Sequence, residues 1–285
     1  MGPLLFILYI NDLPLVLSDS TSVALYADDA TIFTSSPTIS GINASLNNCV
    51  PSLLDWAKNN DMVLHDKKTK VMAIGTRQRL HNSSEPLNVC FGSTKISNSE
   101  CEKVLGVYID SSLRWTEHID YLIKKLNGKL NVIKRIRHFL PLEQRIILYN
   151  ALIKPNLEYC CSVWGNCSVE DLNRLLKFQK LSGRLLLNAD SLSRSVPLFN
   201  TLKWLPIYDI ISISKAVLLF KCFHNLAPLY ISSQFTRLSD THSYRTRASL
   251  KGDLFISPEL CSCDSGRRTF YFSVSTLWNS LPSTI

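Results

Sequence analysis

The sequence predicts an α+β fold, with short strands and helices in the first 110 residues and mostly helices after them. Two strand-like apolar runs lie close together between residues 23 and 34. From Trp115 onward, apolar residues recur every three to four positions, which is the helical spacing. With 285 residues, 46% of them hydrophobic, the chain can form one large domain or two modest ones.

The first predicted element is a helix over residues 2–10, with Pro3 in its first turn. Residues 4–10 are all apolar, so this helix is expected to be buried on more than one side. Asn11 and Asp12 interrupt the run, and no basic segment precedes it, which argues against a signal peptide. No segment reaches the roughly 20 apolar residues of a membrane span. We therefore expect an intracellular protein, nuclear or cytoplasmic, that is neither secreted nor bound to a membrane.

The next predicted element is a β-hairpin formed by residues 23–26 and 30–34, with Ala27, Asp28 and Asp29 between the strands. Two adjacent carboxylates repel each other, and a divalent cation relieves that repulsion. Mg²⁺ prefers oxygen ligands and usually takes one or two protein carboxylates. The sequence therefore indicates a metal site, although a solvent-facing Asp-Asp turn is the alternative interpretation.

Helical spacing then predicts a helix over residues 40–60, with Pro51 as a bend. Short apolar runs predict strands at residues 71–74, 87–91 and 104–110. In the last of these, Gly106 marks a place where another group can approach closely. A boundary near 110–115 precedes the helical part, where helices are expected at residues 115–137, 142–153, 169–187 and 208–224.

Charge is distributed unevenly along the chain, whose formal net charge is +8. Residues 1–60 contain five Asp and one Lys, so the remaining residues carry a net charge of +12. This asymmetry suits a protein that concentrates metal ions in one place and binds a polyanion elsewhere, although a merely basic domain is the alternative. Basic residues outside the apolar face of helix 115–137 are candidates for nucleic-acid binding: Lys124, Lys125, Lys129, Lys134, Arg135 and Arg137.

Several segments, in order along the chain, resemble the reverse transcriptases of non-LTR (LINE-type) retrotransposons. Gly2-Pro3-Leu4-Leu5-Phe6 and residues 9–13 are similar to the second half of the helix motif that precedes the family's catalytic hairpin. Tyr26-Ala27-Asp28-Asp29 is similar to its catalytic tetrad. Further segments of similarity follow at residues 56–60, 64–72, 104–110, 149–157, 159–164 and 278–282.

The resemblance implies a partial polymerase palm over residues 1–112, made of a helix, the catalytic hairpin and a small antiparallel sheet. It implies a helical thumb and connection over 113–235, and a C-terminal region of loops and short strands over 236–285. The complete protein would be an RNA-directed DNA polymerase. It would use two Mg²⁺ ions and deoxynucleotides to extend a DNA primer on an RNA template.

Carried over residue by residue, the resemblance makes Asp28 and Asp29 the catalytic, metal-binding carboxylates. Lys68 would approach the phosphates of the nucleotide, whereas a solvated lysine in a basic run is the alternative. The residues expected beside the nucleotide and the primer strand are Tyr26, Ala27, Leu105 and Gly106.

The chain departs from the family pattern in two ways. His65 stands where the family usually has Asn. The family also has a further catalytic Asp and template-gripping fingers before the matching helix, so we expect that the chain as given does not polymerise by itself. The alternative function is a catalytically inactive remnant, or a nucleic-acid-binding module derived from the polymerase.

Overall fold

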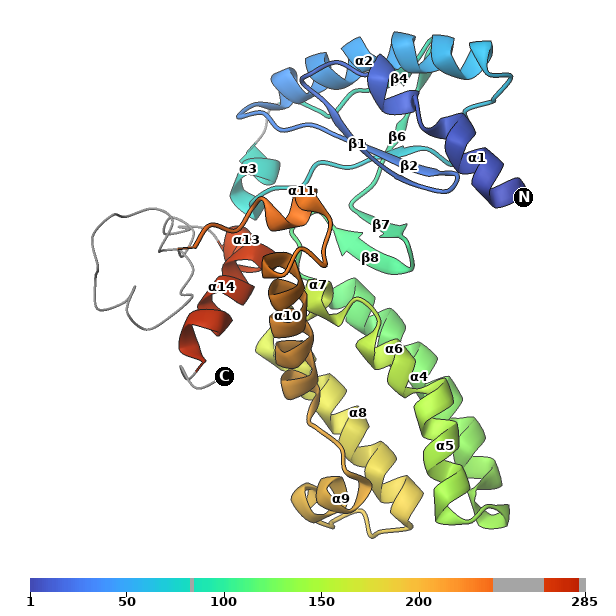
Figure 1. Ribbon diagram of the computed structural model, residues 1–285, viewed down its shortest axis with the longest axis vertical. Helices are drawn as coiled ribbons and strands as arrows, with labels where there is room; N and C mark the ends of the chain where they lie inside the picture. The colour runs from blue at the N-terminus through green and yellow to red at the C-terminus, as the bar shows by residue number, and fades with distance from the viewer. Residues whose placement is uncertain (83–84, 238–263, 282–285) are drawn as a thin grey trace. The chain divides into compact units, whose positions relative to one another are not determined.

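A computed structural model describes residues 1–82, 85–237 and 264–281, and the chain divides into two compact units, residues 1–102 and 103–285 (Figure 1). Helices and small two-stranded sheets both occur, which confirms the predicted α+β class. In the described part of the chain, no helix is long and apolar enough to cross a membrane.

Unit 1 (residues 1–102) is built around one long helix, α2, against which the N-terminal segment and a hairpin pack. The Thr38 side chain caps α2 by accepting the Gly41 N–H at 3.2 Å, and Pro51 lies inside the helix as predicted. A buried cluster joins α2 to the segment after α1: Ile10, Leu13, Leu53, Trp56 and Ala57. The helices of this unit are α1 (Gly2–Ile10), a 3₁₀ turn (Leu13–Val16), α2 (Ile39–Asn59) and α3 (Arg77–Asn82).

The helix α1 forms where the sequence predicts it, but the expectation that it is buried on more than one side is wrong. Leu4, Leu5 and Leu8 are 60–66% exposed, and Ile10 is the buried residue of the helix. The reason is that α1 contacts the core of unit 1 mainly through its C-terminal end, with Phe6 packing partly against the same cluster.

The strands of unit 1 form separate pairs in place of the single small antiparallel sheet that was expected. β1 pairs with β2 and β4 with β5 in antiparallel fashion, whereas β3 and β6 are parallel. Asparagine side chains of α2 take the place of a strand partner, because Asn47 Oδ1 accepts the Cys90 N–H at 3.0 Å and Asn43 Oδ1 accepts the Asn88 N–H at 2.8 Å. The strands are β1 (Ser22–Tyr26), β2 (Asp29–Phe33), β3 (Lys70–Val71), β4 (Cys90–Phe91), β5 (Thr94–Lys95) and β6 (Ser97–Asn98).

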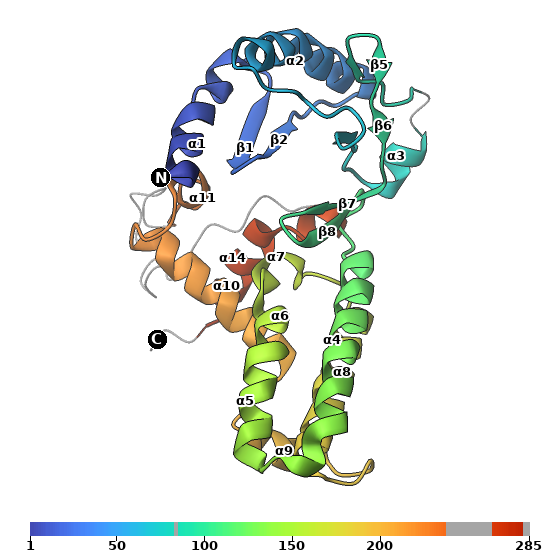
Figure 2. The same ribbon diagram turned by 90° about the vertical axis from the view of Figure 1, so that its right-hand side faces the viewer.

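Unit 2 (residues 103–285) is mostly helical, and α4, α5 and α8 run alongside one another (Figures 1 and 2). The predicted apolar face of α4 is confirmed, since Ile119, Leu126 and Ile133 are fully buried. The helices predicted at 142–153, 169–187 and 208–224 are also confirmed. The elements are β8 (Val107–Asp110), α4 (Thr116–Ile136), a 3₁₀ turn (Arg137–Phe139), α5 (Leu142–Leu152), α6 (Lys154–Glu158), α7 (Cys161–Trp164), α8 (Val169–Leu187), α9 (Ser195–Leu202), α10 (Ile207–Phe223) and α11 (Leu229–Ser232).

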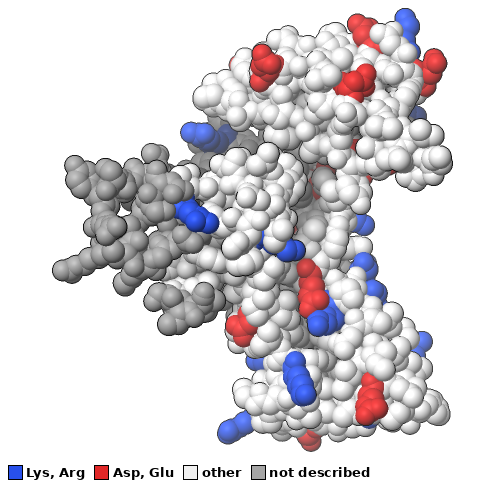
Figure 3. All heavy atoms as spheres, in the orientation of Figure 1, with Lys and Arg blue, Asp and Glu red and all other residues white. Residues whose placement is uncertain are grey.

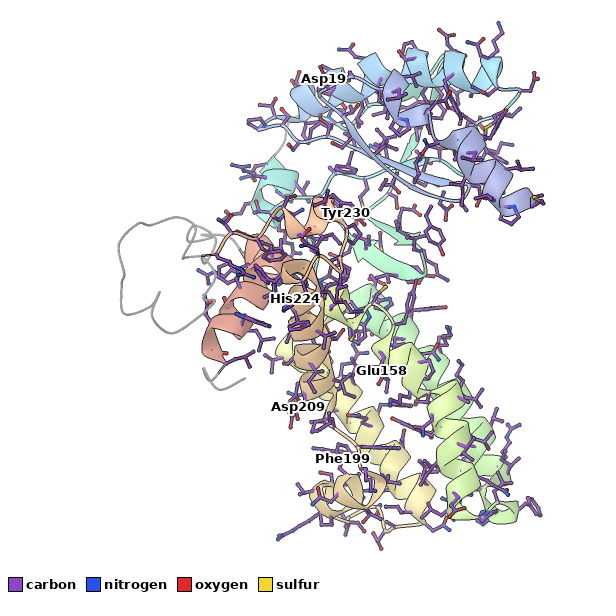
Figure 4. The ribbon with its side chains drawn as sticks, viewed as in Figure 1. Asp19, Glu158, Phe199, Asp209, His224 and Tyr230 are labelled. Atoms are coloured by element: carbon purple, nitrogen blue, oxygen red, sulfur yellow. The ribbon has the colours of Figure 1, made fainter. Side chains whose placement is uncertain are left out.

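The C-terminal region was expected to contain loops and short strands, but its described residues form α13 (Asp264–Arg267) and α14 (Phe270–Ser280). The Thr269 side chain caps α14, and apolar residues spaced by four positions, Phe270, Val274 and Trp278, form a face that packs near Leu219 of α10. Residues 238–263 and 282–285 lie outside the described part. Figure 4 labels Asp209 and His224 at the two ends of α10.

Candidate functional site

The acidic hairpin has one face on the core of unit 1 and one face open to solvent. Leu25 and Ile32 pack against the cluster around Trp56, whereas Tyr26 and Asp29 pair across the strands on the opposite, exposed face. Because side chains alternate along a strand, the half-buried Leu25 and Ile32 determine which way the exposed Tyr26 and Asp29 point. The hairpin therefore places Tyr26 and Asp29 next to each other on the solvent side.

The turn of this hairpin consists of Ala27 and Asp28, so Asp29 is the first residue of β2 and does not belong to the turn as expected. Ala27 has a φ of +51°, the left-handed conformation that a tight hairpin turn requires. Asp28 and Asp29 are both exposed. Asp28 in the turn and Asp29 at the start of β2 are thus presented from the tip of a hairpin that packs on the core.

Asp28 and Asp29 fit part of a Mg²⁺ ligand set. Both supply carboxylate oxygens, which Mg²⁺ prefers. Among the residues that the structure describes, no three His, Cys, Asp or Glu side chains are grouped as a metal site. Mg²⁺ in phosphoryl-transfer enzymes commonly uses one or two protein carboxylates and completes its shell with water and substrate phosphate oxygens. The residues present are compatible with that arrangement.

Lys68 lies in a turn that the His65 carbonyl closes. That oxygen accepts the Lys68 N–H at 3.0 Å and the Thr69 N–H at 2.9 Å. The Lys68 side chain is exposed, whereas nearby Lys70 donates through Nζ to Ser97 Oγ at 2.7 Å. His65 thus shapes this turn through its backbone carbonyl. The role of Lys68 stays a prediction.

The segment 9–13, which resembles a family motif, ties the N-terminal helix to α2. Asp12 Oδ1 accepts the Trp56 Nε1–H at 3.0 Å, and the Tyr9 hydroxyl donates to the Asn60 carbonyl. Leu13 is buried in the cluster below the hairpin. These contacts stabilise the apolar cluster on which the hairpin packs. The sequence alone did not predict this role.

The prediction of one continuous strand over 104–110 is wrong: residues 107–110 form β8, but the two-residue turn of a second hairpin precedes them. β7 (Cys101–Val104) pairs with β8, and Leu105 and Gly106 connect them with φ of +47° and +87°. Two consecutive residues with positive φ are the mark of a hairpin turn that matches strand twist, and Gly accepts this at no steric cost. Gly106, at which the sequence predicts a close approach of another group, is the second residue of this turn.

A groove of about 330 Å³ lies beside this turn, within unit 2. Leu105 and Gly106 line it, together with residues of α4 and of the segment around α6. Two lysines, Lys103 and Lys125, line the groove, and neither Asp nor Glu does. Glu158, the last residue of α6, is labelled in Figure 4 and directly precedes Tyr159, which also lines the groove.

The two groove lysines are gathered around one aromatic ring. Lys103 Nζ lies 4.8 Å and Lys125 Nζ 5.8 Å from the centroid of the Tyr121 ring. The positive charges of both lysines act on His118, a buried residue of the groove. Burial, together with Lys103 and Lys125, lowers the pKa of His118 from 6.5 to about 4. The two ammonium groups make the groove electropositive, which favours an anionic ligand.

The basic residues predicted on α4 differ in their surroundings. Lys124, Lys125, Lys134 and Arg135 are exposed. Lys129 is half-buried, and its Nζ donates to the Leu152 carbonyl at 2.9 Å, which joins α4 to α5. Arg137 Nε donates to the ring of His138 at 3.5 Å. Figure 3 shows Lys and Arg side chains along the edge of unit 2 where α4 runs.

Sequence reasoning missed Lys103, His118, Tyr121 and Tyr159 as groove residues. Lys103 and Tyr121 are 18 positions apart, and Tyr159 lies 54 positions from the Leu105 carbonyl that it contacts. No local pattern links residues so far apart. The available signal was that Tyr159 begins one of the segments that resemble a family motif.

Comparisons with known proteins give a consistent result. Residues 1–125 match the family model described as reverse transcriptase (RNA-dependent DNA polymerase). The chain is 22% identical over 218 residues to a probable RNA-directed DNA polymerase from transposon X-element of Drosophila melanogaster. It is 23% identical over 184 residues to the RNA-directed DNA polymerase from mobile element jockey of the same species. It is 25% identical over 167 residues to a retrovirus-related Pol polyprotein from type-1 retrotransposable element R1 of Bradysia coprophila.

These matches cover much of this chain but little of the relatives. The three alignments include 74%, 61% and 57% of this chain, and 24%, 20% and 16% of the respective relatives. The chain therefore spans about a quarter or less of the length of the curated proteins that it matches. No solved structure matches the chain at a significant level.

Proposed function

We propose that this chain contributes part of the nucleotidyl-transfer site and part of the nucleic-acid grip of a reverse transcriptase of the non-LTR retrotransposon kind, because residues 1–125 match the reverse transcriptase model and the relatives are retrotransposon polymerases. Residues 1–112 would form part of the palm, residues 113–235 the thumb and connection, and residues 236–285 a C-terminal region. The substrates would be an RNA template, a DNA primer and deoxynucleotides.

The main support for this proposal is the way in which the acidic hairpin packs on the core of unit 1. Its buried face is anchored by Leu25 and Ile32, and its exposed face presents Asp29 beside Tyr26, next to Asp28 in the turn. A merely solvent-facing loop would not need strands held in register on a hydrophobic cluster. Packing of the hairpin on this cluster gives the carboxylates of Asp28 and Asp29 a defined orientation, which metal-assisted phosphoryl transfer requires.

In this proposal Asp28 and Asp29 hold divalent metal as oxygen ligands. When bound, two Mg²⁺ ions supply charge stabilisation to the attacking and leaving oxygens of the transferred nucleotide. Tyr26, on the same face as Asp29, would flank the incoming nucleotide, and Ala27 would leave room for the primer end. Lys68 would donate a proton to the departing pyrophosphate from its exposed position in the loop.

The groove beside Leu105 and Gly106 would hold the nucleic-acid strand. Lys103 and Lys125 line it and no Asp or Glu side chain does, so a phosphate in the groove would meet two ammonium groups. The exposed Lys124, Lys134 and Arg135 would extend this contact along α4, together with Arg137. Lys129 would contribute less, because its ammonium group already binds the Leu152 carbonyl.

The test is primer extension on an RNA template by this chain, and by the longest protein that contains it. We expect Asp28→Asn and Asp29→Asn each to abolish extension while leaving the affinity for primer–template unchanged. Asp55→Asn is the matched control, because Asp55 is an exposed carboxylate on α2 of the same unit. Extension retained in both hairpin variants would overturn the assignment of the catalytic carboxylates.

The alternative of an inactive, nucleic-acid-binding module is favoured less by the reverse transcriptase matches. It predicts salt-sensitive binding of the duplex without extension in any form of the protein. The same experiment distinguishes the two, because the longest protein would then bind primer–template and leave the primer unextended.

A further inference from the structure

The Leu105–Gly106 turn is backbone-strained at a place where ligand contact is proposed. Leu105 has a φ of +47° and is 43% exposed, although a leucine pays a steric cost in the left-handed region. Such a conformation persists only when surrounding contacts hold it. Two side chains from the helical part of unit 2 supply these contacts.

The first contact comes from Tyr159, whose hydroxyl donates to the Leu105 carbonyl at 2.7 Å. The backbone of Tyr159 is itself anchored on both sides. Its N–H donates to the Pro155 carbonyl at 3.0 Å, and its carbonyl accepts the Trp164 Nε1–H at 2.8 Å. Because the backbone of Tyr159 is held by these two hydrogen bonds, its side chain can fix the position of the Leu105 carbonyl.

The second contact comes from His118 of α4. Its Nδ1 accepts the backbone N–H of Tyr108, two residues after the turn, at 3.3 Å. His118 is 4% exposed, and its ring lies 5.7 Å from that of Trp164, which is fully buried. Trp164 therefore contacts both residues, through its indole N–H to the Tyr159 carbonyl and through a tilted ring contact with His118.

We infer that Tyr159 and His118 are positioning residues, which hold the Leu105–Gly106 turn over the groove so that it can grip a nucleic-acid strand. The inference rests on the proposed function of the groove. Tyr159 fixes the turn at the Leu105 carbonyl, and His118 fixes the strand that leaves it. A nucleic-acid strand in the groove would then meet a turn that is already ordered, so binding would not have to order it.

The test uses Tyr159→Phe, which removes one hydroxyl and keeps the ring, in the full chain. Tyr208→Phe is the matched control, because Tyr208 is 49% exposed on α10 and does not line the groove. Amide hydrogen exchange of residues 103–110 is expected to rise in Tyr159→Phe and to stay unchanged in the control. Exchange in α8 should not change in either variant, which would separate a local loosening from global destabilisation.

The affinity for an RNA–DNA duplex, measured by fluorescence anisotropy, should fall about 3- to 10-fold in Tyr159→Phe, as expected for one lost hydrogen bond. The slope of affinity against salt should not change, because no phosphate contact is removed. His118→Asn, which keeps an acceptor near the Nδ1 position, should bind more tightly than His118→Leu. This rescue would not be expected if His118 only filled space.

Unchanged exchange at 103–110 in Tyr159→Phe would overturn the inference, because the turn would then not depend on this contact. Raised exchange with unchanged duplex affinity would also overturn it, because the turn would not serve binding. If the wild-type chain and the longest protein containing it both fail to bind duplex, the proposed function fails. In that case the exchange measurement still decides whether Tyr159 holds the turn.

Discussion

The Asp110 carboxylate accepts the backbone N–H of Trp115 at 2.7 Å, and this contact organises the start of α4. The same carboxylate accepts the N–H groups of Ser112 and Arg114, each at 3.0 Å. Trp115 is the N-cap of α4 and has a φ of +69°, and its side chain makes no cap hydrogen bond, because an indole has no acceptor for a helix N–H group. Asp110 thus fixes the loop that leads into α4 and joins the second hairpin to the basic helix.

Asp110→Asn should lower the free energy of unfolding by about 1–3 kcal/mol, because an amide cannot accept all of these hydrogen bonds. Urea unfolding followed by circular dichroism measures this. Asp190→Asn is the control, since Asp190 accepts the Leu192 N–H at 2.9 Å in a fully exposed loop. An equal loss in both variants would contradict a special role of Asp110 at the start of α4.

The stability of unit 2 should depend on pH through His118. Burial and two nearby lysines lower its pKa from 6.5 to about 4 in the folded protein. Between these values the unfolded chain binds a proton and the folded chain does not, so acidification favours unfolding. We expect the free energy of unfolding to fall by roughly 2–3 kcal/mol from pH 6.5 to pH 4.

In His118→Asn this part of the pH dependence should disappear, because Asn does not titrate. Urea unfolding at a series of pH values measures the difference between the two proteins. Asp110 also has a lowered pKa, since its hydrogen bonds outweigh the effect of burial, but its contribution is lost only as the pH falls below about 4. An identical slope between pH 6.5 and pH 4 in the variant would exclude His118 as its source.

Arg174 of α8 binds Asp171 on its own helix and Asp120 on α4, and so joins the two helices. Its guanidinium lies 2.8 Å from Asp171 Oδ1 and 2.5 Å from Asp120 Oδ1 on α4. Asp171 is 4% exposed and also accepts from Thr116 and Ser168. Arg174→Met should destabilise the protein by about 1–3 kcal/mol, because the buried carboxylate of Asp171 loses its cation.

Asp120→Asn should cost less than Arg174→Met, because Asp120 is half exposed and solvent replaces the interaction. Thermal unfolding of both single variants and of the double variant gives the coupling between the two residues. A larger effect of Asp120→Asn would show that the surface part of the network dominates.

Duplex binding should depend on salt through the groove lysines. We expect Lys103→Ala and Lys125→Ala each to reduce the slope of log affinity against log salt by about 1, because each removes one phosphate contact. Lys177→Ala, an exposed lysine on α8, is the control. Fluorescence anisotropy at several salt concentrations gives the slopes, and unchanged slopes in both groove variants would place the nucleic acid elsewhere.

The sequence by itself determined the local elements whose apolar pattern is regular. The spacing of Ile119, Leu126 and Ile133 predicted the buried face of α4, and the structure confirms it. The two apolar runs around Asp28 and Asp29 predicted the first hairpin in the same way. A side-chain period of two or of three to four is imposed by the backbone geometry, so it can be read without tertiary information.

Only the tertiary structure decided where the second hairpin turns and what holds it. Residues 104–110 read as one apolar strand, because the pattern alone cannot show the positive φ of Leu105. The hydrogen bond from Tyr159 to the Leu105 carbonyl spans 54 positions. The hydrogen bond from the half-buried Lys129 to the Leu152 carbonyl spans 23 positions. Such contacts depend on how helices pack, and packing energy is shared among residues that no local window contains.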